Sequence, residues 1–260
     1  ELAIEAALKA GEVIMEIYDG EDFSVEIKDD HSPLTKADKA AHEIIKSHLS
    51  NSSYYLLSEE GAKIPYDERK TWNSFWMVDP IDGTKEFIKR NGEFTVNIGF
   101  IQNQKPVLGV VYAPALRYLY FAEEGFGSFK VENTTNLKDF NSNHFIDLAK
   151  ITHPDIYTMV VSRSHMSKET QEFVNLKEKE HGTIELTSFG SSLKICKVAE
   201  GSANCYPRFG PTMEWDTAAA HAIASIATCY ITKTDLISPL MYNKEDLLNP
   251  YFIVQANDNC

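Results

Sequence analysis

The sequence is short of cysteine, of basic residues relative to acidic ones, and of long apolar runs. Only four of its 260 residues are cysteines, and none forms a Cys-x-x-Cys pair. They are too few for a disulfide scaffold and wrongly spaced for zinc. The longest apolar stretch, residues 218–231, is interrupted by polar side chains and falls short of the roughly 20 apolar residues that cross a bilayer. We therefore predict a cytoplasmic protein with no integral membrane segment.

The acidic excess also limits the partners of this protein. Lys and Arg number 25 against 38 Asp and Glu, for a net charge of −13. Proteins that bind nucleic-acid backbones through bulk charge are normally basic, so we expect no nucleic-acid partner. A small anionic substrate is compatible with this charge if its site holds metal ions or local basic residues. The 14 Phe, 12 Tyr and 3 Trp supply enough core material to exclude intrinsic disorder.

Hydrophobic periodicity divides the chain into two halves near residue 145. Residues 1–145 are predicted to form an α+β half that ends in a polar linker at 132–143. The first residues carry no secretory signal pattern, and because the sequence lacks an initial Met we expect a few native residues before Glu1. The elements expected in this half are helices over 1–18 and from Thr35, strands at 54–57 and 75–78, and an antiparallel meander over 94–131.

Residues 146–260 show alternating strand and helix patterns, which favour an α/β half with layers of sheet and helix. The expected strands are 157–161, 184–189, 202–206, 229–231 and 252–254, and the expected helices are 168–181, 191–200 and 217–227. Together the two halves predict a mixed, layered α/β fold.

The densest chemical signal is the motif Asp79-Pro80-Ile81-Asp82-Gly83-Thr84. Pro80 lacks an N–H, so we expect the preceding strand to end at the motif, and Gly83 permits a sharp turn. The irregular backbone frees the Ile81 carbonyl to point inward. Carboxylate and carbonyl oxygens are the ligands that Mg²⁺ prefers. The alternative interpretation is a surface turn, since Asp, Pro and Gly are all turn residues.

Three further carboxylates are candidates for the same site. Glu59 follows a predicted strand, and a solvated acidic loop is its alternative interpretation. Asp216 precedes the helix expected from Thr217, so it is equally interpreted as an N-cap. Asp38 forms a Thr-x-x-Asp capping signal with Thr35. Neighbouring carboxylates repel one another, so a cluster of them normally requires cations.

Basic and hydroxyl groups form a second candidate set. His165 follows a predicted strand, Ser191 and Lys194 open a predicted helix, and Arg208 lies in a loop bounded by Pro and Gly. Free N–H groups at a helix start suit anion binding. Ordinary surface solvation is the alternative interpretation of these side chains.

Four motifs in this order resemble the inositol monophosphatase superfamily of metal-dependent, lithium-sensitive phosphatases. They are Ser32–Asp38, Ser58–Glu60, Asp79–Thr84 and Trp215–Ala219. The resemblance covers nearly the whole chain and implies a layered αβαβα sandwich of the inositol monophosphatase and sugar phosphatase type. Within the superfamily, Thr84–Ile88, Gly92–Asn97, Ser162–His165 and Ser191–Lys194 are similar to the 3'(2'),5'-bisphosphate nucleotidase branch.

The resemblance also implies roles for individual residues. One Mg²⁺ would be shared by Glu59, Asp79 and the Ile81 carbonyl, and a second would lie among Asp79, Asp82 and Asp216. A weaker third ion would bind near Glu59 through waters. Asp38 would orient Thr84, whose hydroxyl positions the attacking water. The residues implied to hold the substrate are Gly83, Thr84, His165, Ser191, Lys194 and Arg208.

These expectations predict a phosphatase that converts adenosine 3',5'-bisphosphate to AMP and phosphate, a reaction that the resemblance places in sulfate assimilation. An inositol or sugar phosphate monophosphatase on the same scaffold is the alternative. A catalytically inactive metal- or nucleotide-binding protein is a third reading, and the presence of Thr84 and all the carboxylates argues against it. The sequence makes no prediction about oligomeric state, and peripheral attachment to the inner membrane stays open.

Overall fold

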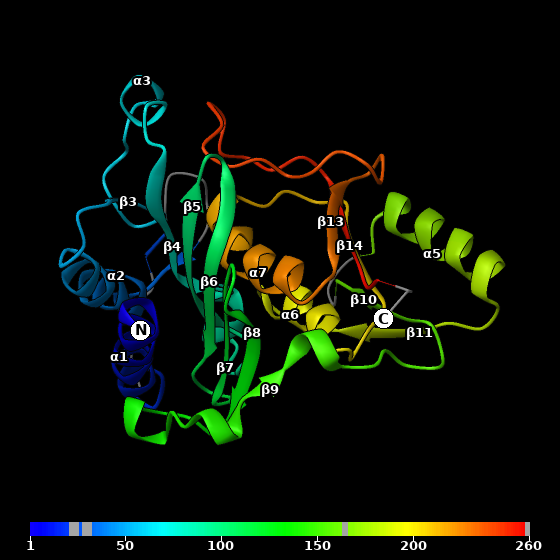
Figure 1. Ribbon diagram of the computed structural model, residues 1–260, viewed down its shortest axis with the longest axis horizontal. Coiled ribbons are helices and arrows are strands. Elements are labelled where there is room, and N and C mark those ends of the chain that lie inside the picture. The colour runs from blue at the N-terminus through cyan, green and yellow to red at the C-terminus, as the bar shows by residue number, and fades with distance from the viewer. Residues whose placement is uncertain (21–25, 28–32, 163–165, 258–260) are drawn as a thin grey trace.

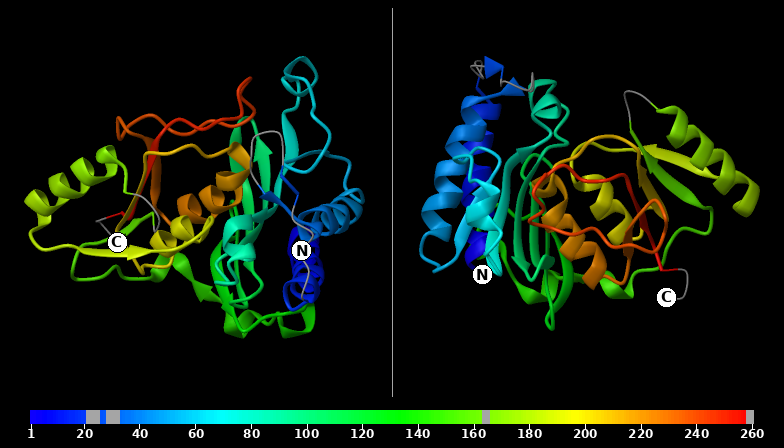
Figure 2. Two further views of the ribbon diagram at one scale, coloured as in Figure 1. Left: turned by 180° about the vertical axis from the view of Figure 1, so that it is seen from behind. Right: turned by 90° about the horizontal axis from the view of Figure 1, so that it is seen from above.

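The computed structural model describes residues 1–20, 26–27, 33–162 and 166–257. The described helices and sheets form five layers, which Figure 1 shows side by side and Figure 2 shows from behind and above. Helices α1 (Leu2–Tyr18) and α2 (Lys36–Leu49) form the first layer, and a seven-stranded sheet forms the second. Helices α6 (Leu193–Ala199) and α7 (Glu214–Ile226) lie between this sheet and a five-stranded sheet. Helix α5 (Lys168–His181) covers the far side. The predicted αβαβα sandwich is confirmed.

The seven-stranded sheet contains the predicted meander. Its strands follow one another in chain order, and only the first pair, β3 with β4, is parallel. The strands are β3 (Tyr55–Ser58), β4 (Ser74–Asp82), β5 (Thr95–Gln102), β6 (Lys105–Ala113), β7 (Tyr118–Glu123), β8 (Gly127–Glu132) and β9 (Ile146–Asp147). Two short helices, α3 (Tyr66–Arg69) and α4 (Thr84–Ile88), flank β4, and β1 (Glu26–Ile27) pairs with β2 (Pro33–Leu34).

Alternating side chains of this sheet fill two separate cores. Val96 and Ile98 of β5 are fully buried against the α1 and α2 layer. On the opposite face, α7 lies directly on strands β5 and β6, because the residues that face it there, Gly99 and Gly109, have no side chains. A Cβ atom at Gly109 would lie 2.1 Å from the Ala219 carbonyl oxygen. This close approach brings the first turn of α7 to the end of the sheet where β4 finishes.

The second sheet has the strand order β11-β10-β12-β14-β13. Its strands are β10 (Thr158–Val161), β11 (Glu185–Ser188), β12 (Cys205–Arg208), β13 (Tyr230–Lys233) and β14 (Phe252–Gln255). The strands of the two sheets thus come from opposite sides of the predicted boundary near residue 145. Because α6 and α7 of the second half cover the sheet of the first, the division into two domains stays a proposal. No helix in the described ranges is both long and apolar enough to cross a membrane.

Three predictions about elements of the candidate site are wrong. The strand expected at 202–206 is β12 (Cys205–Arg208), so Arg208 ends a strand and does not lie in a loop. The strand expected at 75–78 continues through Pro80 to Asp82. This is possible because Pro80 lies in a β-bulge, where the missing N–H interrupts no regular ladder bond. Helix α7 begins at Glu214 instead of Thr217, so Asp216 lies in its first turn and is not the N-cap. The Asp216 carboxylate still accepts a hydrogen bond from the Met213 N–H at 2.9 Å.

Candidate active site

The bulge in β4 places two aspartates on one face of the sheet. Asp79 lies opposite Asn97 of β5, and Asp82 lies opposite Thr95, so β4 carries one extra residue between the two pairs. In a regular strand, residues three apart point to opposite faces. The extra residue cancels this alternation. Asp79 and Asp82 therefore share the face to which Thr95 and Asn97 also point.

Two other elements bring carboxylates to the same place. Glu59 continues the parallel pairing of β3 with β4, since its N–H donates to the Val78 carbonyl at 3.1 Å. Asp216 arrives from the first turn of α7. Carboxylate oxygens of Glu59, Asp79 and Asp216 all lie within 4.8 Å of one another. Three elements that are distant in sequence thus converge on one acidic cluster.

Burial and mutual repulsion disfavour the charged forms of this cluster. Burial, followed by the nearby charges of Glu59, Asp82 and Asp216, raises the pKa of Asp79 well above its usual range. Burial and the charge of Asp82 do the same to the pKa of Asp216. The pKa of Asp82 is also raised by burial, although Lys194 opposes the shift. A bound cation would reverse this electrostatic balance.

The donor set fits a hard divalent cation. Its side-chain donors are carboxylate oxygens, and the Ile81 carbonyl lies at the same bend, 3.3 Å from the Thr84 hydroxyl. Such all-oxygen sets suit Mg²⁺ and Ca²⁺ and do not suit soft metals. Asp82 lies beside the cluster, where its charge acts on both Asp79 and Asp216.

Thr84 and Asp38 lie together at the edge of the cluster. The Thr84 hydroxyl donates to Asp38 Oδ1 at 3.2 Å. Asp38 is 1% exposed, and its second oxygen accepts hydrogen bonds from Thr35 at 2.8 Å and 2.6 Å. Gly83 precedes Thr84 with φ of 91°, a left-handed conformation that favours glycine. This turn directs Thr84 back toward the carboxylates.

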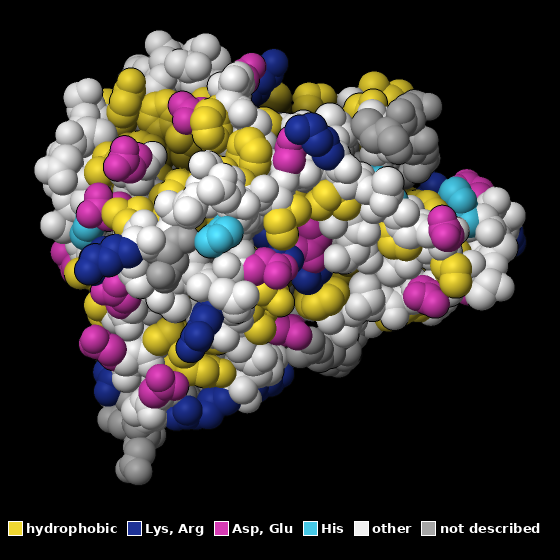
Figure 3. Space-filling model, turned by 60° about the horizontal axis from the view of Figure 1, so that its bottom comes forward, with side chains coloured by type: hydrophobic (Ala, Val, Ile, Leu, Met, Phe, Trp, Pro, Cys, Tyr) yellow, Lys and Arg dark blue, Asp and Glu magenta, His cyan; other side chains and the backbone are white. Residues whose placement is uncertain are grey.

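A cavity of about 250 Å³ extends from the carboxylates to the second sheet. It is lined by Asp82 and Asp216 at one end, and by Lys194 and Arg208 elsewhere on its wall. A neighbouring cavity of about 430 Å³ shares Asp82 and Asp216 and adds Glu59 and Thr84. Figure 3 shows a face of the molecule on which acidic and basic side chains meet in a central hollow.

The two cations of this cavity are only partly satisfied within the protein. The Lys194 ammonium donates to the Ser191 carbonyl at 2.6 Å, and burial lowers the pKa of Lys194 to about 8. Arg208 donates to Ser162 at 3.4 Å and to the Pro211 carbonyl at 2.9 Å. Its buried Nε has no hydrogen-bond partner among the described residues. An anion in the cavity would meet the positive charges of Lys194 and Arg208 on its wall.

The structure brings together all but one of the predicted site residues. His165 lies outside the described residues, and the other predicted residues lie on the two adjoining cavities or in the cluster beside them. Sequence reasoning missed Asn97, Ser192 and Glu86. The alternation that placed Val96 inside a core also put Asn97 on the opposite face of β5, and this signal would have identified it.

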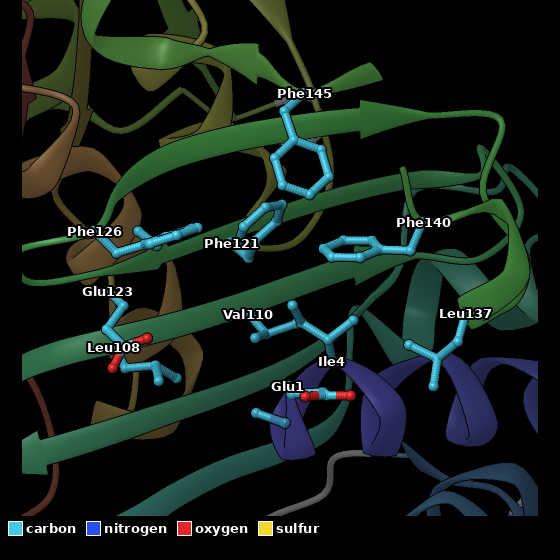
Figure 4. A pocket seen from close by; sticks show the side chains of 12 residues that line it. Glu1, Ile4, Leu108, Val110, Phe121, Glu123, Phe126, Leu137, Phe140 and Phe145 are labelled. Carbon is cyan, nitrogen blue, oxygen red and sulfur yellow. The ribbon is translucent and has the colours of Figure 1, made fainter. Parts of the chain in front are cut away.

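A larger cavity of about 450 Å³ lies elsewhere, between α1, strands β6 and β7, and residues 137–145 (Figure 4). Its wall includes Phe121, Phe126, Phe140 and Phe145, and the charged residues among its described lining are Glu1 and Glu123. With apolar walls and acidic charges alone, this cavity does not suit a phosphate.

Comparison with known proteins finds relatives that match along nearly the whole chain. A model of the inositol monophosphatase family matches residues 1–257. The 3'(2'),5'-bisphosphate nucleotidase CysQ of Escherichia coli strain K12 is 44% identical over 254 residues, which cover 96% of each chain. The crystal structure of CysQ from Bacteroides thetaiotaomicron has a TM-score of 0.90 and 50% identity, covering 98% of this chain and 96% of that one. The extragenic suppressor protein suhB of Bartonella henselae shares the fold, with a TM-score of 0.74 at 22% identity over 98% of this chain and 92% of its own.

Proposed function

We propose that this chain, which belongs to the inositol monophosphatase family, hydrolyses the 3'-phosphate of adenosine 3',5'-bisphosphate to give AMP and phosphate. Relatives named as 3'(2'),5'-bisphosphate nucleotidases are 44% identical to it over nearly the full length of both chains. The chain is accordingly a phosphatase of the bisphosphate nucleotidase type.

One observation carries the choice of substrate: acidic and basic groups line a single cavity. Asp82 and Asp216 line the acidic end of this cavity. Lys194 and Arg208 line another part of the same cavity and are positively charged. A bisphosphate would place its reacting phosphate at the carboxylate end and its other phosphate near the two cations. A substrate with one phosphate would leave one of these two regions without a partner, which costs binding energy.

The protein's own groups would orient the reaction. Mg²⁺ held by Glu59, Asp79, Asp82, Asp216 and the Ile81 carbonyl would neutralise phosphoryl charge and acidify a bound water. The Thr84 hydroxyl donates a hydrogen bond to Asp38, so its oxygen keeps a lone pair that can accept a hydrogen bond from the attacking water. Lys194 and Arg208 would hold the second phosphate and use its binding energy to align the first. The resemblance supports two or three Mg²⁺ ions per site.

Comparing three substrates under saturating Mg²⁺ tests this proposal. We expect kcat/KM for adenosine 3',5'-bisphosphate to exceed that for AMP and inositol 1-phosphate by at least tenfold, and the product to be AMP. A preference for inositol 1-phosphate would favour the inositol or sugar phosphate monophosphatase instead. Absence of phosphate release from all three, with metal binding intact, would favour an inactive binding protein.

The cellular compartment and the metabolic role of this reaction also belong to the proposal. A cytoplasmic role in sulfate assimilation rests on the resemblance alone. The three described cysteines, Cys196, Cys205 and Cys229, are all free thiols, which agrees with a reducing compartment.

A further inference from the structure

A chain of hydrogen bonds joins Ser192 at the start of α6 and Asn97 of β5 to Asp82 of β4. The Ser192 hydroxyl donates to Asn97 Oδ1 at 2.8 Å, and Asn97 Nδ2 donates to Asp82 Oδ2 across a long bond of 3.5 Å. Asn97 and Ser192 are 1% and 3% exposed, so water does not compete for these bonds.

The donors of this chain all point toward the Asp82 carboxylate. Thr95 and Ser192 share a hydroxyl–hydroxyl contact of 2.9 Å. Because Ser192 already donates to an amide oxygen, Thr95 must be the donor in this contact. The chain therefore runs from Thr95 to Ser192 to Asn97 and ends on Asp82. The amide orientation agrees with this direction, because an ionised Asp82 only accepts hydrogen bonds and must face the Asn97 NH₂ group, which leaves the amide oxygen toward Ser192.

The same contacts fix the segment that carries Lys194, one of the basic groups of the cavity. Ser192 is the N-cap of α6, and Lys194 follows two residues later. A second residue of the β5 region holds this segment, since Glu93 Oε2 accepts the Gly190 N–H at 2.7 Å. Gly190 is needed there because a Cβ atom would lie 2.6 Å from the Glu93 carbonyl oxygen. The β5 region thus touches both the metal-binding carboxylate and the substrate-binding turn.

We infer that Asn97 is a positioning residue, which orients Asp82 for metal binding and couples that orientation to the α6 turn through Ser192. The inference rests on the proposed function only in assigning metal binding to Asp82. Residues that orient metal ligands typically contribute 10–100-fold to metal affinity or activity. A residue that merely filled the core would contribute to stability and leave metal affinity unchanged.

Direct metal binding tests this inference without substrate. We would titrate the substrate-free protein with Mn²⁺, followed by calorimetry and electron paramagnetic resonance, in the parent, Asn97→Leu, Ser192→Ala and the double variant. Leu removes the amide groups of Asn97 and retains a similar volume. The matched control is Asn204→Ala, since Asn204 is also buried but holds the Thr158 N–H of the second sheet at 2.8 Å. Melting temperature is measured for every variant.

We expect Asn97→Leu and Ser192→Ala each to raise the Mn²⁺ dissociation constant about tenfold or more, and the double variant to add little further. Asn204→Ala should lower the melting temperature and leave Mn²⁺ affinity unchanged. Unchanged affinity in Asn97→Leu and Ser192→Ala, or fully multiplicative losses in the double variant, would overturn the inference. If Asn97→Leu does not fold, unchanged affinity in Ser192→Ala overturns it alone. If the parent does not hydrolyse the bisphosphate but Asn97→Leu and Ser192→Ala still weaken Mn²⁺ binding, the proposed function is rejected and the positioning role is retained.

Discussion

Asp38 holds Thr84 with one carboxylate oxygen and caps helix α2 with the other. Oδ1 accepts the Thr84 hydroxyl at 3.2 Å, while Oδ2 accepts both the backbone N–H and the hydroxyl of Thr35. The structure contains a complete capping box at this helix start. The capping and active-site interpretations of Asp38 are therefore compatible, because the two oxygens face different elements.

Replacing Asp38 by Asn should break one of the two contacts, because an amide has one accepting oxygen and one donating nitrogen. The oxygen should keep the two Thr35 donors, which leaves the Thr84 hydroxyl facing the amide nitrogen. We therefore expect Asp38→Asn to lower kcat by at least tenfold and to reduce stability by less than the roughly 0.5–2 kcal/mol that a lost cap costs. Steady-state kinetics and thermal melting check the two effects separately.

Thr84 supplies the matched comparison for this prediction. Thr84→Val keeps the shape but removes the hydroxyl, so it should lower kcat without loosening α2. Thr84→Ser keeps the hydroxyl and should retain most of the activity. If Thr84→Val turns over normally, the hydroxyl does not position water.

The layers of the fold were predictable from the sequence because periodicity reports burial directly. Residues such as Val96 and Ile98 alternate with polar neighbours, and the structure buries them as expected. The bulge at Pro80 was not predictable in this way, since its effect depends on the register between β4 and β5. That register places Asp79 and Asp82 on one face. The Asp79–Thr84 motif predicted which residues are the metal ligands. Only the pairing of β4 with β5 explains how the side chains of Asp79 and Asp82 come together.

The metal-free carboxylate cluster should destabilise the protein. The pKa of Asp79 is raised in the folded state, so below this pKa the native protein binds more protons than the unfolded chain, and metal-free stability falls as pH rises through it. Asp79→Asn should raise the melting temperature of the metal-free protein at pH 7 by a few degrees, since 1 kcal/mol corresponds to roughly 2–4 °C in a domain of this size.

The same substitution should abolish activity and remove most of the stabilisation that Mg²⁺ provides to the parent. Melting curves in EDTA and in excess Mg²⁺ measure both effects. A metal-free variant that melts below the parent would show that Asp79 is held by contacts other than those to a cation.

Lys194 should matter more for a bisphosphate than for a monophosphate. Hydrogen bonds to charged groups contribute about 1.5–3 kcal/mol, so Lys194→Met should lower kcat/KM for the bisphosphate by about tenfold or more. Because burial lowers the pKa of Lys194 to about 8, the parent's KM should rise as pH increases above this value, whereas the variant's KM should lack this rise. Equal losses of kcat/KM for AMP and for the bisphosphate in Lys194→Met would indicate that Lys194 has a structural role.

Lithium should inhibit the enzyme in competition with one Mg²⁺. The ions are similar in radius, but Li⁺ carries half the charge, and it would stabilise the departing oxygens less well. We expect inhibition by millimolar LiCl, with NaCl at equal ionic strength as the control, and a change in its strength as Mg²⁺ is varied. Activity that responds equally to both salts would contradict this prediction.

His221 should make the protein less stable in acid. Its ring is buried in α7, with Nδ1 2.8 Å from the Tyr242 hydroxyl, and burial lowers its pKa from 6.5 to about 4. Between these values the unfolded chain binds the proton and the native protein does not, so stability falls as pH decreases from 6.5 toward 4. At 1.36 kcal/mol per pH unit, the loss approaches about 3 kcal/mol. Removing the imidazole should therefore flatten this part of the stability profile.

Denaturant unfolding of the parent and His221→Gln at several pH values between 4 and 7 measures this difference. The buried aspartates titrate in both proteins, so the subtraction isolates the imidazole. His144→Gln is the control for a His-to-Gln change at an exposed position. At pH 7, His221→Gln should have a lower free energy of unfolding than the parent if Gln forms a weaker hydrogen bond to Tyr242. The gap between the two free energies of unfolding should narrow as the pH falls. A gap that stays constant down to pH 4 would mean that the His221 imidazole is protonated as easily in the native protein as in the unfolded chain, against the effect of its burial.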